Sequence, residues 1–212
     1  MRSLILLLAG VGTAFSQHLS VGLKGGVPMT DFLNSVSSGT SVFSSKTQRY
    51  IVGPTVELRL PAGFGVELDA LYRHFSYNST ASLVDVFTNN RTTGNAWEFP
   101  LLLKYRFPGP LVRPFVDAGV AFDTLSGLKQ TVTRTIFPSR TTNTTTTSDP
   151  SELNKKSTVG FVMGVGLDIH ALVIHLSPEI RYTRWGTEHF KLPNGSFLSN
   201  QNQAEFLVGI TF

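Results

Sequence analysis

The sequence predicts an all-β fold, an antiparallel up-and-down barrel of eight strands. Eight stretches of roughly ten residues alternate apolar with polar or small side chains, which is the period of a strand with two different faces. The connectors between them are short and long in turn, and no helical periodicity follows the N-terminal region. The predicted strands span residues 18–28, 49–60, 63–77, 95–107, 112–124, 157–170, 172–185 and 202–212.

The chain begins with a pattern typical of an exported protein. Arg2 precedes an apolar run, and the small residues Ala14 and Ser16 have the spacing that signal peptidase recognises. A membrane anchor is the alternative, but the run is well short of the roughly 20 apolar residues that a spanning helix needs. We expect a cleaved signal peptide over residues 1–16 and one barrel domain over residues 17–212.

Composition narrows the class of protein further. A chain of 212 residues suits a single domain, and a formal net charge of +4, spread along the chain, is too small to indicate nucleic acid as a partner. The sequence has no cysteine, although export would place it where disulfides form. We therefore expect backbone pairing and packing to hold the fold.

In the predicted strands one parity is mainly apolar, and almost every charge lies on the opposite parity. Gly residues accompany the charges, as the inner wall of a narrow barrel requires. In chain order the charged positions are Lys24 in the first strand, Glu57 and Arg59 in the second, Glu67, Asp69 and Arg73 in the third, Glu98, Lys104 and Arg106 in the fourth, Asp117 and Asp123 in the fifth, Asp168 in the sixth, Glu179 and Arg181 in the seventh, and Glu205 in the eighth.

The connectors indicate which end of the barrel faces which compartment. Short periplasmic turns and long extracellular loops are typical of outer-membrane barrels. Residues 141–150 form a Thr-rich tract that cannot bury enough apolar surface to order itself, so we expect a mobile exposed loop there. The short turns lie at 60–63, 108–111 and 170–171, and the long polar loops at 29–48, 78–94, 125–156 and 187–201.

The placement of aromatic residues predicts that the apolar wall faces lipid. A soluble lipocalin is also an eight-stranded up-and-down barrel, but its apolar side chains would line a central cavity. Here aromatic residues of the apolar parity gather near both strand ends, as two membrane interfaces would select. The predicted girdles are Tyr50, Tyr72, Trp97, Phe122 and Tyr182 toward the loops and Phe64, Phe107 and Phe212 toward the turns.

Three segments carry a family resemblance. Residues 97–107 (WEFPLLLKYRF), 177–182 (SPEIRY) and 205–212 (EFLVGITF) resemble strands of the porin-like outer-membrane β-barrel proteins, which are related in architecture to small OmpA/OmpX-type barrels. The resemblance covers residues 17–212 and implies location and architecture rather than transport. The residues that look like the signal read by the barrel assembly machinery are Phe206, Val208, Ile210 and Phe212.

The width of the barrel limits what its lumen can do. Eight strands leave just enough room for the barrel's own side chains, so an open porin channel is not expected. Charges in a narrow lumen are costly unless paired, and both signs are present. We expect a paired network, with a narrow porin-like passage for small solutes or ions as the alternative. The predicted network comprises Glu57, Arg59, Glu67, Asp69, Arg73, Glu98, Lys104, Arg106, Glu179 and Arg181.

The sequence shows no pattern for catalysis, a metal or a cofactor. His74, Glu188 and His189 lie near the loop end, but a His–Glu pair among many hydroxyls arises by chance, and no nucleophile elbow or metalloprotease motif is present. His175 has no second ligand at metal-binding spacing, so we expect it to hydrogen bond a carboxylate in the lumen. We name no catalytic, metal-binding or cofactor-binding residue, and rank a membrane enzyme lowest.

The long loops are the remaining candidates for function, because loops on a rigid scaffold commonly carry binding. We expect a structural, adhesive or surface-interaction role, with outer-membrane lipid and lipopolysaccharide, the assembly machinery and an extracellular ligand as partners. A solvated loop without a partner is the alternative. The basic residues around the Thr-rich loop that could contact anionic lipopolysaccharide or a host or phage surface are Lys129, Arg134, Arg140, Lys155 and Lys156.

Overall fold

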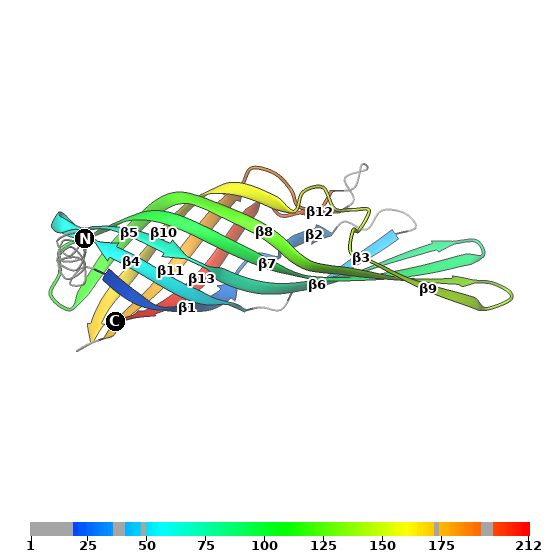
Figure 1. Ribbon diagram of the computed structural model, residues 1–212, viewed down its shortest axis with the longest axis horizontal. Helices are drawn as coiled ribbons and strands as arrows, with labels where there is room; N and C mark the ends of the chain where they lie inside the picture. The colour runs from blue at the N-terminus through cyan, green and yellow to red at the C-terminus, as the bar shows by residue number, and fades with distance from the viewer. Residues whose placement is uncertain (1–18, 36–40, 48–49, 172–173, 192–196) are drawn as a thin grey trace, which may run out of the picture.

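The described residues form a closed barrel with a sheet that projects from one end (Figure 1). The computed structural model describes residues 19–35, 41–47, 50–171, 174–191 and 197–212. The predicted signal peptide, residues 1–16, therefore lies outside the described residues.

Within the described ranges, the strands in chain order are β1 (Leu19–Pro28), β2 (Leu33–Ser35), β3 (Ser41–Thr47), β4 (Ile51–Arg59), β5 (Phe64–Asp69), β6 (Leu71–Leu83), β7 (Val86–Arg106), β8 (Val112–Ile136), β9 (Thr141–Thr147), β10 (Ser157–Ala171), β11 (Ile174–Trp185), β12 (Phe197–Ser199) and β13 (Asn202–Thr211).

The barrel closes because the last strand pairs with the first. β1 is antiparallel to β4 on one side and to β13 on the other, where Gly22 faces Thr211 and Pro28 faces Glu205. The ring continues from β4 through β5 and β6, β7, β8, β10 and β11 back to β13. If β5 and β6 are counted as one wall strand, the described ring has eight strands, which confirms the predicted fold class.

One predicted strand, residues 63–77, is divided into β5 and β6 at Ala70. Both parts keep the same register against β7, with Leu68 opposite Leu101 and Leu71 opposite Glu98. Pro54 of β4 accepts a hydrogen bond from the Ala70 amide at 3.0 Å, but proline has no amide to donate in return. The missing ladder bond interrupts the strand without changing which side chains face inward.

The two ends of the barrel differ in the length of their connectors. At the turn end, the short helix η1 (Pro61–Gly63) joins β4 to β5, and Ala62 and Gly63 take positive φ values of 61° and 85°. β10 runs to Ala171, past the predicted turn at residues 170–171. The opposite end, which we call the loop end, carries β2, β3, β9 and β12. No helix in the described part of the chain is long and apolar enough to cross a bilayer.

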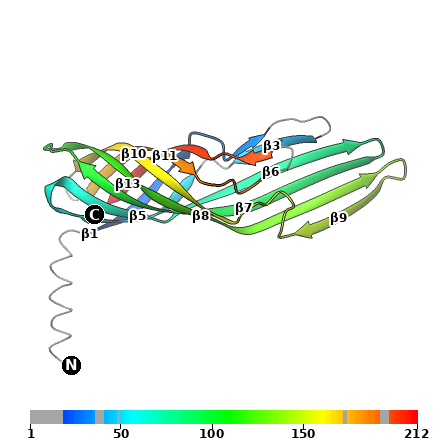
Figure 2. The ribbon, with the colours of Figure 1, turned by 90° about the horizontal axis from the view of Figure 1, so that it is seen from above.

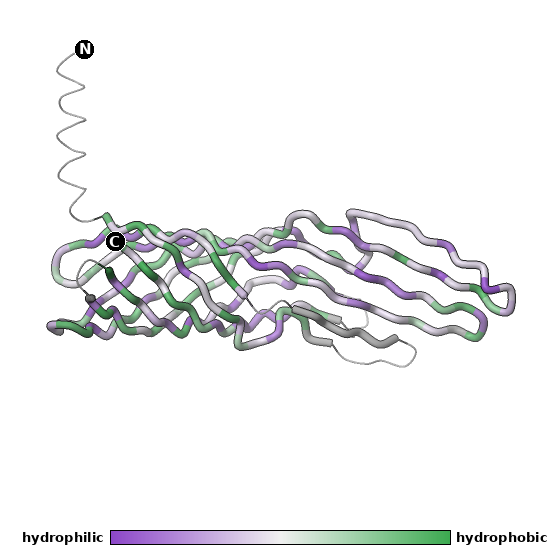
Figure 3. Tube along the Cα trace, turned by 90° about the horizontal axis from the view of Figure 1, so that it is seen from below, coloured by the Kyte–Doolittle hydropathy of each residue, from purple (hydrophilic) through white to green (hydrophobic). Residues whose placement is uncertain are grey.

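The wall has the predicted orientation, with apolar side chains outside and charges inside. On β7, Leu101 and Leu103 are 45% and 56% exposed, whereas Glu98 is 3% exposed. On β11, Ile180 is 50% exposed and Arg181 is fully buried. Figure 3 shows the same alternation of hydrophobic and hydrophilic residues along the barrel strands, and paler, more hydrophilic strands in the projecting sheet.

The projecting sheet replaces two connectors that the sequence predicted as loops, residues 78–94 and 125–156. β6 and β7 continue as a paired hairpin to Leu83 and Val86, and β8 continues to Ile136. Figure 2 shows these strands running on past the barrel, flanked by β3 and β9. We call this part the extension, defined as β3, β9, residues 76–83 of β6, residues 86–93 of β7 and residues 129–136 of β8.

A β-bulge separates the extension from the barrel. Thr93 faces Lys129, but Asn95 faces Ser126, so β8 has an extra residue there. Gly127 has a φ of 59°, the left-handed conformation that such bulges place on glycine. Because of the extra residue, the inward positions of β8 change from odd numbers to even numbers beyond this point.

The Thr-rich tract is also ordered, contrary to the predicted mobile loop. Residues 141–147 form β9, which pairs with β8 from Gln130 to Ile136. Every residue of β9 is exposed, so burial does not hold it in place. Backbone pairing and the β-branched threonines, which favour extended conformations, account for the strand.

Candidate functional site

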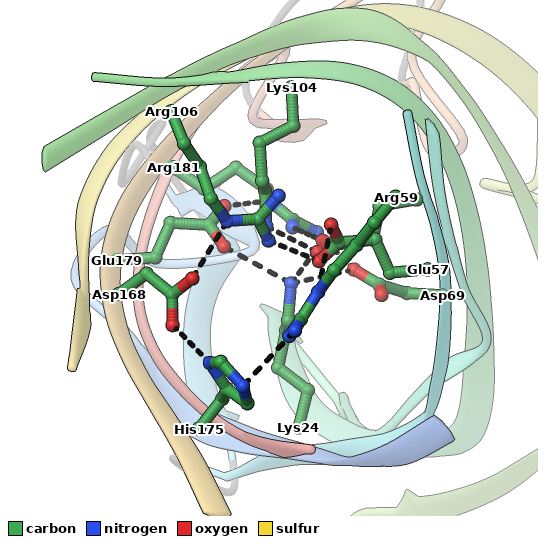
Figure 4. Close-up of polar contacts among 11 residues, drawn as sticks. Lys24, Glu57, Arg59, Asp69, Lys104, Arg106, Asp168, His175, Glu179 and Arg181 are labelled. Atoms are coloured by element: carbon green, nitrogen blue, oxygen red, sulfur yellow. Dashed lines mark hydrogen bonds and ion pairs between the residues drawn. The ribbon is translucent and has the colours of Figure 1, made fainter. Parts of the chain in front are cut away.

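The middle of the lumen holds a compact cluster of buried ion pairs (Figure 4). Arg181 donates to Glu179 at 2.6 Å, to Asp69 at 2.9 Å and to Glu67 at 3.3 Å. Lys24 lies 3.1 Å from both Asp69 and Glu179 and also binds Glu67. Lys104, from the neighbouring strand β7, binds Glu67 as well. Strands far apart in the sequence are thus joined across the lumen by charge.

A second cluster lies toward the turn end. Arg106 donates through Nε to Asp168 at 2.8 Å and through Nη2 to Glu57. His175 Nδ1 lies 3.0 Å from Asp168, which confirms the predicted carboxylate contact of this histidine. Arg59 donates through Nη1 to His175 Nε2 at 3.0 Å. The five side chains Glu57, Arg106, Asp168, His175 and Arg59 thus form one connected chain of contacts (Figure 4).

A third cluster lies toward the loop end. Arg73 donates to Asp123 at 2.8 Å, to Gln203 at 2.7 Å and to Glu205 at 3.4 Å. Glu98, which the sequence placed in the paired network, has no carboxylate–cation contact within 4.0 Å among the described residues. The neighbouring carboxylates of Asp123 and Glu205 pair with Arg73 instead.

The structure places all ten predicted network residues on the inner side of the wall. Nine are buried and Arg59 is partly exposed at the turn end. The further inward charges seen in the alternation, Lys24, Asp117, Asp123, Asp168 and Glu205, are buried as well. Asp117 is unusual because neither carboxylate oxygen has a hydrogen-bond partner in the described chain.

The loop end of the lumen is covered by an apolar lid, which the sequence analysis missed. Phe32 and Leu33, with Phe190 from the segment after β11, pack on inward side chains of the wall. Phe32 and Phe75 have ring centroids 5.0 Å apart, and Phe190 lies 5.5 Å from Tyr77. We use "lid" for Phe32, Leu33, Leu153 and Phe190 together with the wall residues Phe75, Tyr77, Ala96, Leu125 and Leu128.

Backbone and polar contacts attach the lid to the barrel. β2 pairs with β12, and Ser199 Oγ accepts hydrogen bonds from the amides of His189 and Phe190. His189 Nδ1 donates to the Lys155 carbonyl at 2.8 Å, and its Nε2 lies 3.3 Å from Asp123. The guanidinium of Arg73 lies 4.7 Å from the Phe32 ring centre, which joins the lid to the charged lumen below it.

The outward face of the extension carries a shallow polar groove of about 390 Å³. β7 and β8 place Phe87 opposite Thr135, Asn89 opposite Thr133 and Arg91 opposite Thr131. β9 adds further hydroxyl groups beside β8, since Thr144 pairs with Thr133. Lys129 is exposed on the same face, and by strand register no Asp or Glu belongs to this face in the described extension. The groove is therefore basic and rich in hydroxyls.

The aromatic residues predicted as girdles lie on the outward parity at both ends of the wall. Tyr72 and Trp97 have ring centroids 5.2 Å apart toward the loop end, and Phe64 and Tyr105 are 5.0 Å apart toward the turn end. Outward residues of the predicted assembly signal lie on β13 or just after it. The remaining predicted girdle and signal residues are Tyr50, Phe107, Phe122, Tyr182, Phe206, Val208, Ile210 and Phe212, which are exposed or partly exposed.

The histidines that the sequence analysis considered for catalysis make structural contacts. His74 Nδ1 lies 2.8 Å from Asn95 Oδ1, and His189 contacts Lys155 and Asp123. Within the described ranges, no three His, Asp or Glu side chains gather in an arrangement that could hold a metal ion.

Comparison with known proteins agrees with the closed ring and the apolar outer wall. The profile of the outer membrane protein beta-barrel domain matches residues 15–186. The protein belongs to this family. The barrel therefore lies in the outer membrane with its apolar wall against lipid. Because outer-membrane barrels place short turns in the periplasm and long loops outside the cell, we expect the turn end in the periplasm and the loop end outside.

Solved structures of outer-membrane proteins match the chain at low sequence identity. OprG from Pseudomonas aeruginosa matches with a TM-score of 0.50 and 12% identity, covering 91% of this chain and 92% of that chain. The N-terminal β-barrel domain of P. aeruginosa OprF has a TM-score of 0.35, 18% identity and coverages of 91% and 97%. Neisserial surface protein A matches with a TM-score of 0.43 and 10% identity, covering 91% of this chain and 95% of that chain. No curated protein sequence matches the chain.

Proposed function

We propose that the barrel is a surface-interaction protein whose working part is the extracellular extension. The observation that carries the proposal is the basic, hydroxyl-rich groove on the outward face of the extension. The lumen favours this assignment over transport, because buried ion pairs fill its middle and the apolar lid covers its extracellular end.

The chemistry of the groove suits an anionic saccharide, such as the sugar–phosphate part of lipopolysaccharide or an acidic polysaccharide of another cell. Threonine hydroxyls and the Asn89 amide can exchange hydrogen bonds with sugar hydroxyls. Arg91 offers a planar fork that matches a carboxylate or phosphate, and Lys129 adds a point charge. Phe87, which is 40% exposed, offers an apolar surface at the end of the groove.

The outer edge of the extension adds a second mode of contact. In the described chain β9 pairs only with β8, so one row of its backbone amides and carbonyls faces solvent. Natural edge strands are commonly protected by charges, proline or a bulge, and residues 141–147 have none of these. An extended segment of a partner could therefore add to this edge.

We propose a non-catalytic role. The imidazoles nearest the extracellular end, those of His74 and His189, are occupied by Asn95, Lys155 and Asp123 rather than directed at a hydroxyl nucleophile. Substitution of either histidine is expected to leave lipase, deacylase and protease assays at the background of the wild type.

A shortened barrel tests the surface role. In this variant one Asn-Gly turn replaces residues 80–89 and another replaces residues 132–145. The strand pairs Ser79–Asn90 and Thr131–Thr146 are kept, and the barrel and lid are left intact. We expect the shortened protein, in nanodiscs, to bind purified lipopolysaccharide at least about tenfold more weakly than the wild type by interferometry. Equal affinity would remove the extension from the proposed function.

Removing two basic side chains of the groove tests whether the outward face of the extension binds the saccharide. Arg91→Gln with Lys129→Gln is expected to weaken binding and to reduce its salt dependence, because exposed charges are screened by salt. Arg134→Gln with Arg140→Gln is the matched control, since it removes the same charge and Arg134 lies on the other parity of β8. Equal losses in the two double variants would show that net charge, rather than the groove, attracts the saccharide.

A further inference from the structure

A pocket of about 640 Å³ opens at the periplasmic rim, far from the extension. It lies between the turn that follows β4 and the turn that follows β7. Arg59, Arg106 and Arg113 supply its charged side, and Phe64, Tyr105 and Phe107 supply its aromatic side. The lining therefore combines three guanidinium groups with three aromatic rings.

The three arginines are not equally engaged. Arg106 binds two carboxylates, those of Asp168 and Glu57. Arg59 reaches Glu57 only at 3.9 Å, and its Nε and Nη2 are buried without a hydrogen-bond partner in the described chain. Arg113 is exposed, and its Nε donates to the Gly109 carbonyl at 2.8 Å. Two guanidinium groups at this rim therefore keep unused donors.

The two carboxylates nearby, those of Glu57 and Asp168, cannot neutralise all three guanidinium groups. Glu57 Oε1, which has no hydrogen-bond partner in the described chain, lies 3.9 Å from Arg59 Nε, beyond hydrogen-bond distance. Glu57 and Asp168 already bind Arg106, and His175 also binds Asp168. Arg113 has no carboxylate within 4.0 Å among the residues described. The pocket thus carries an excess of positive charge, and a buried donor without a partner costs free energy that an anion would recover.

The position of the pocket relative to the bilayer suggests the anion. Phe64 and Phe107 are 42% and 44% exposed on the outward wall, and Tyr105 contacts both rings at 5.0 Å and 5.1 Å. Aromatic residues of the outward wall mark the membrane interface, where lipid phosphates lie. Guanidinium forks bind phosphate oxygens in pairs, and basic pockets at this depth suit lipid headgroups.

We propose that this pocket binds the phosphodiester headgroup of an inner-leaflet phospholipid. Arg59 and Arg113 hold the phosphate, and the first carbons of the acyl chains lie against Phe64, Tyr105 and Phe107. A free periplasmic phosphate has the same charge chemistry but no use for the aromatic side, so lipid is the occupant that satisfies both sides of the pocket.

Native mass spectrometry of the full barrel in detergent, with added phosphatidylglycerol, tests the proposal. Arg59→Gln with Arg113→Gln is expected to lower the bound-lipid fraction at least about tenfold, as loss of charge-assisted hydrogen bonds predicts. Arg134→Gln with Arg140→Gln, at the extracellular end, is expected to retain lipid as the wild type does. A gel shift on heating shows whether each variant is folded.

Two further probes identify the occupant. Diacylglycerol, which has the acyl chains but no phosphate, is expected not to be retained, and inorganic phosphate is expected not to displace phosphatidylglycerol at equal concentration. The proposal is overturned if the rim variant keeps its lipid, if diacylglycerol is retained equally well, or if inorganic phosphate competes on equal terms.

Discussion

At the scale of single residues, the lumen shows why inward charges need specific partners. Arg181 is fully buried and contacts three carboxylates, so its removal leaves those carboxylates short of positive charge in a site without water access. Asp117 is nearly as buried but makes no ion pair in the described chain. Buried ion pairs contribute little net stability when complete, but breaking one by removing a single partner is strongly destabilising.

This contrast gives a matched pair of variants. Arg181→Met is expected to lower the free energy of unfolding by about 3–5 kcal/mol. Asp117→Asn, which keeps the shape and removes only the unpaired charge, is expected to change it by less than about 1 kcal/mol or to raise it. Urea titration in phospholipid vesicles, followed by tryptophan fluorescence, measures both. Similar losses of unfolding free energy in the two variants would show that pairing of the charge does not determine the cost of removing it.

At the scale of elements, the lid is a small apolar core built from segments that are not part of the wall. Phe190 is fully buried between Phe75 and Tyr77, and β2 and β12 hold it there through a two-stranded sheet. Because the lid depends on a few aromatic contacts, its stability is expected to be local and separable from that of the barrel.

Phe190→Ala tests this separation. The cavity left by a buried aromatic ring is expected to cost the lid about 3–5 kcal/mol. Amide hydrogen exchange should quicken in β2 and β12 and stay unchanged in the wall strands. Phe137→Ala is the control, because Phe137, in the turn after β8, is 45% exposed and its loss creates no cavity. Unchanged exchange in β2 and β12 would show that the lid is held by backbone pairing alone.

At the scale of the whole molecule, charge and lid together close the lumen. The middle and loop-end clusters and the lid lie one above another. In the middle cluster Arg181 of β11 binds Asp69 of β5 on the opposite side of the ring, and in the loop-end cluster Arg73 of β6 binds Asp123 of β8 and Glu205 of β13. An eight-stranded barrel has no spare width around such side chains. We therefore expect the molecule to act as a rigid support for the extension rather than as a channel.

Planar-bilayer recording tests that conclusion. The wild type is expected to show no resolved openings at moderate voltage. The double variant Phe32→Ala, Phe190→Ala is expected to stay silent as well, because the ion pairs around Arg181 remain below the lid. Steady openings in the wild type would restore the narrow passage as the function. Openings in the lid variant alone would identify the lid as the barrier.

The sequence by itself determined the wall. Alternation at period two sets which side chains face lipid, and the break in that alternation at each turn marks the strand ends, so positions such as Leu101 and Glu98 could be assigned without coordinates. The same rule failed in the extension for a physical reason. Both of its faces are polar, so residues 86–93 show no apolar alternation, and the bulge at Gly127 shifts the phase of β8.

Only the tertiary structure decided the partners of the charges, the lid and the arginine pocket. Alternation says that Glu98 and Arg73 both face inward, but the reach and packing of neighbouring side chains gave Arg73 to Asp123 and Glu205 instead. Phe32 and Phe190 join one apolar cluster from segments separated by more than half of the chain, and no local sequence pattern predicts that they meet. Local periodicity is a property of the backbone, whereas pairing across the lumen depends on the closed ring.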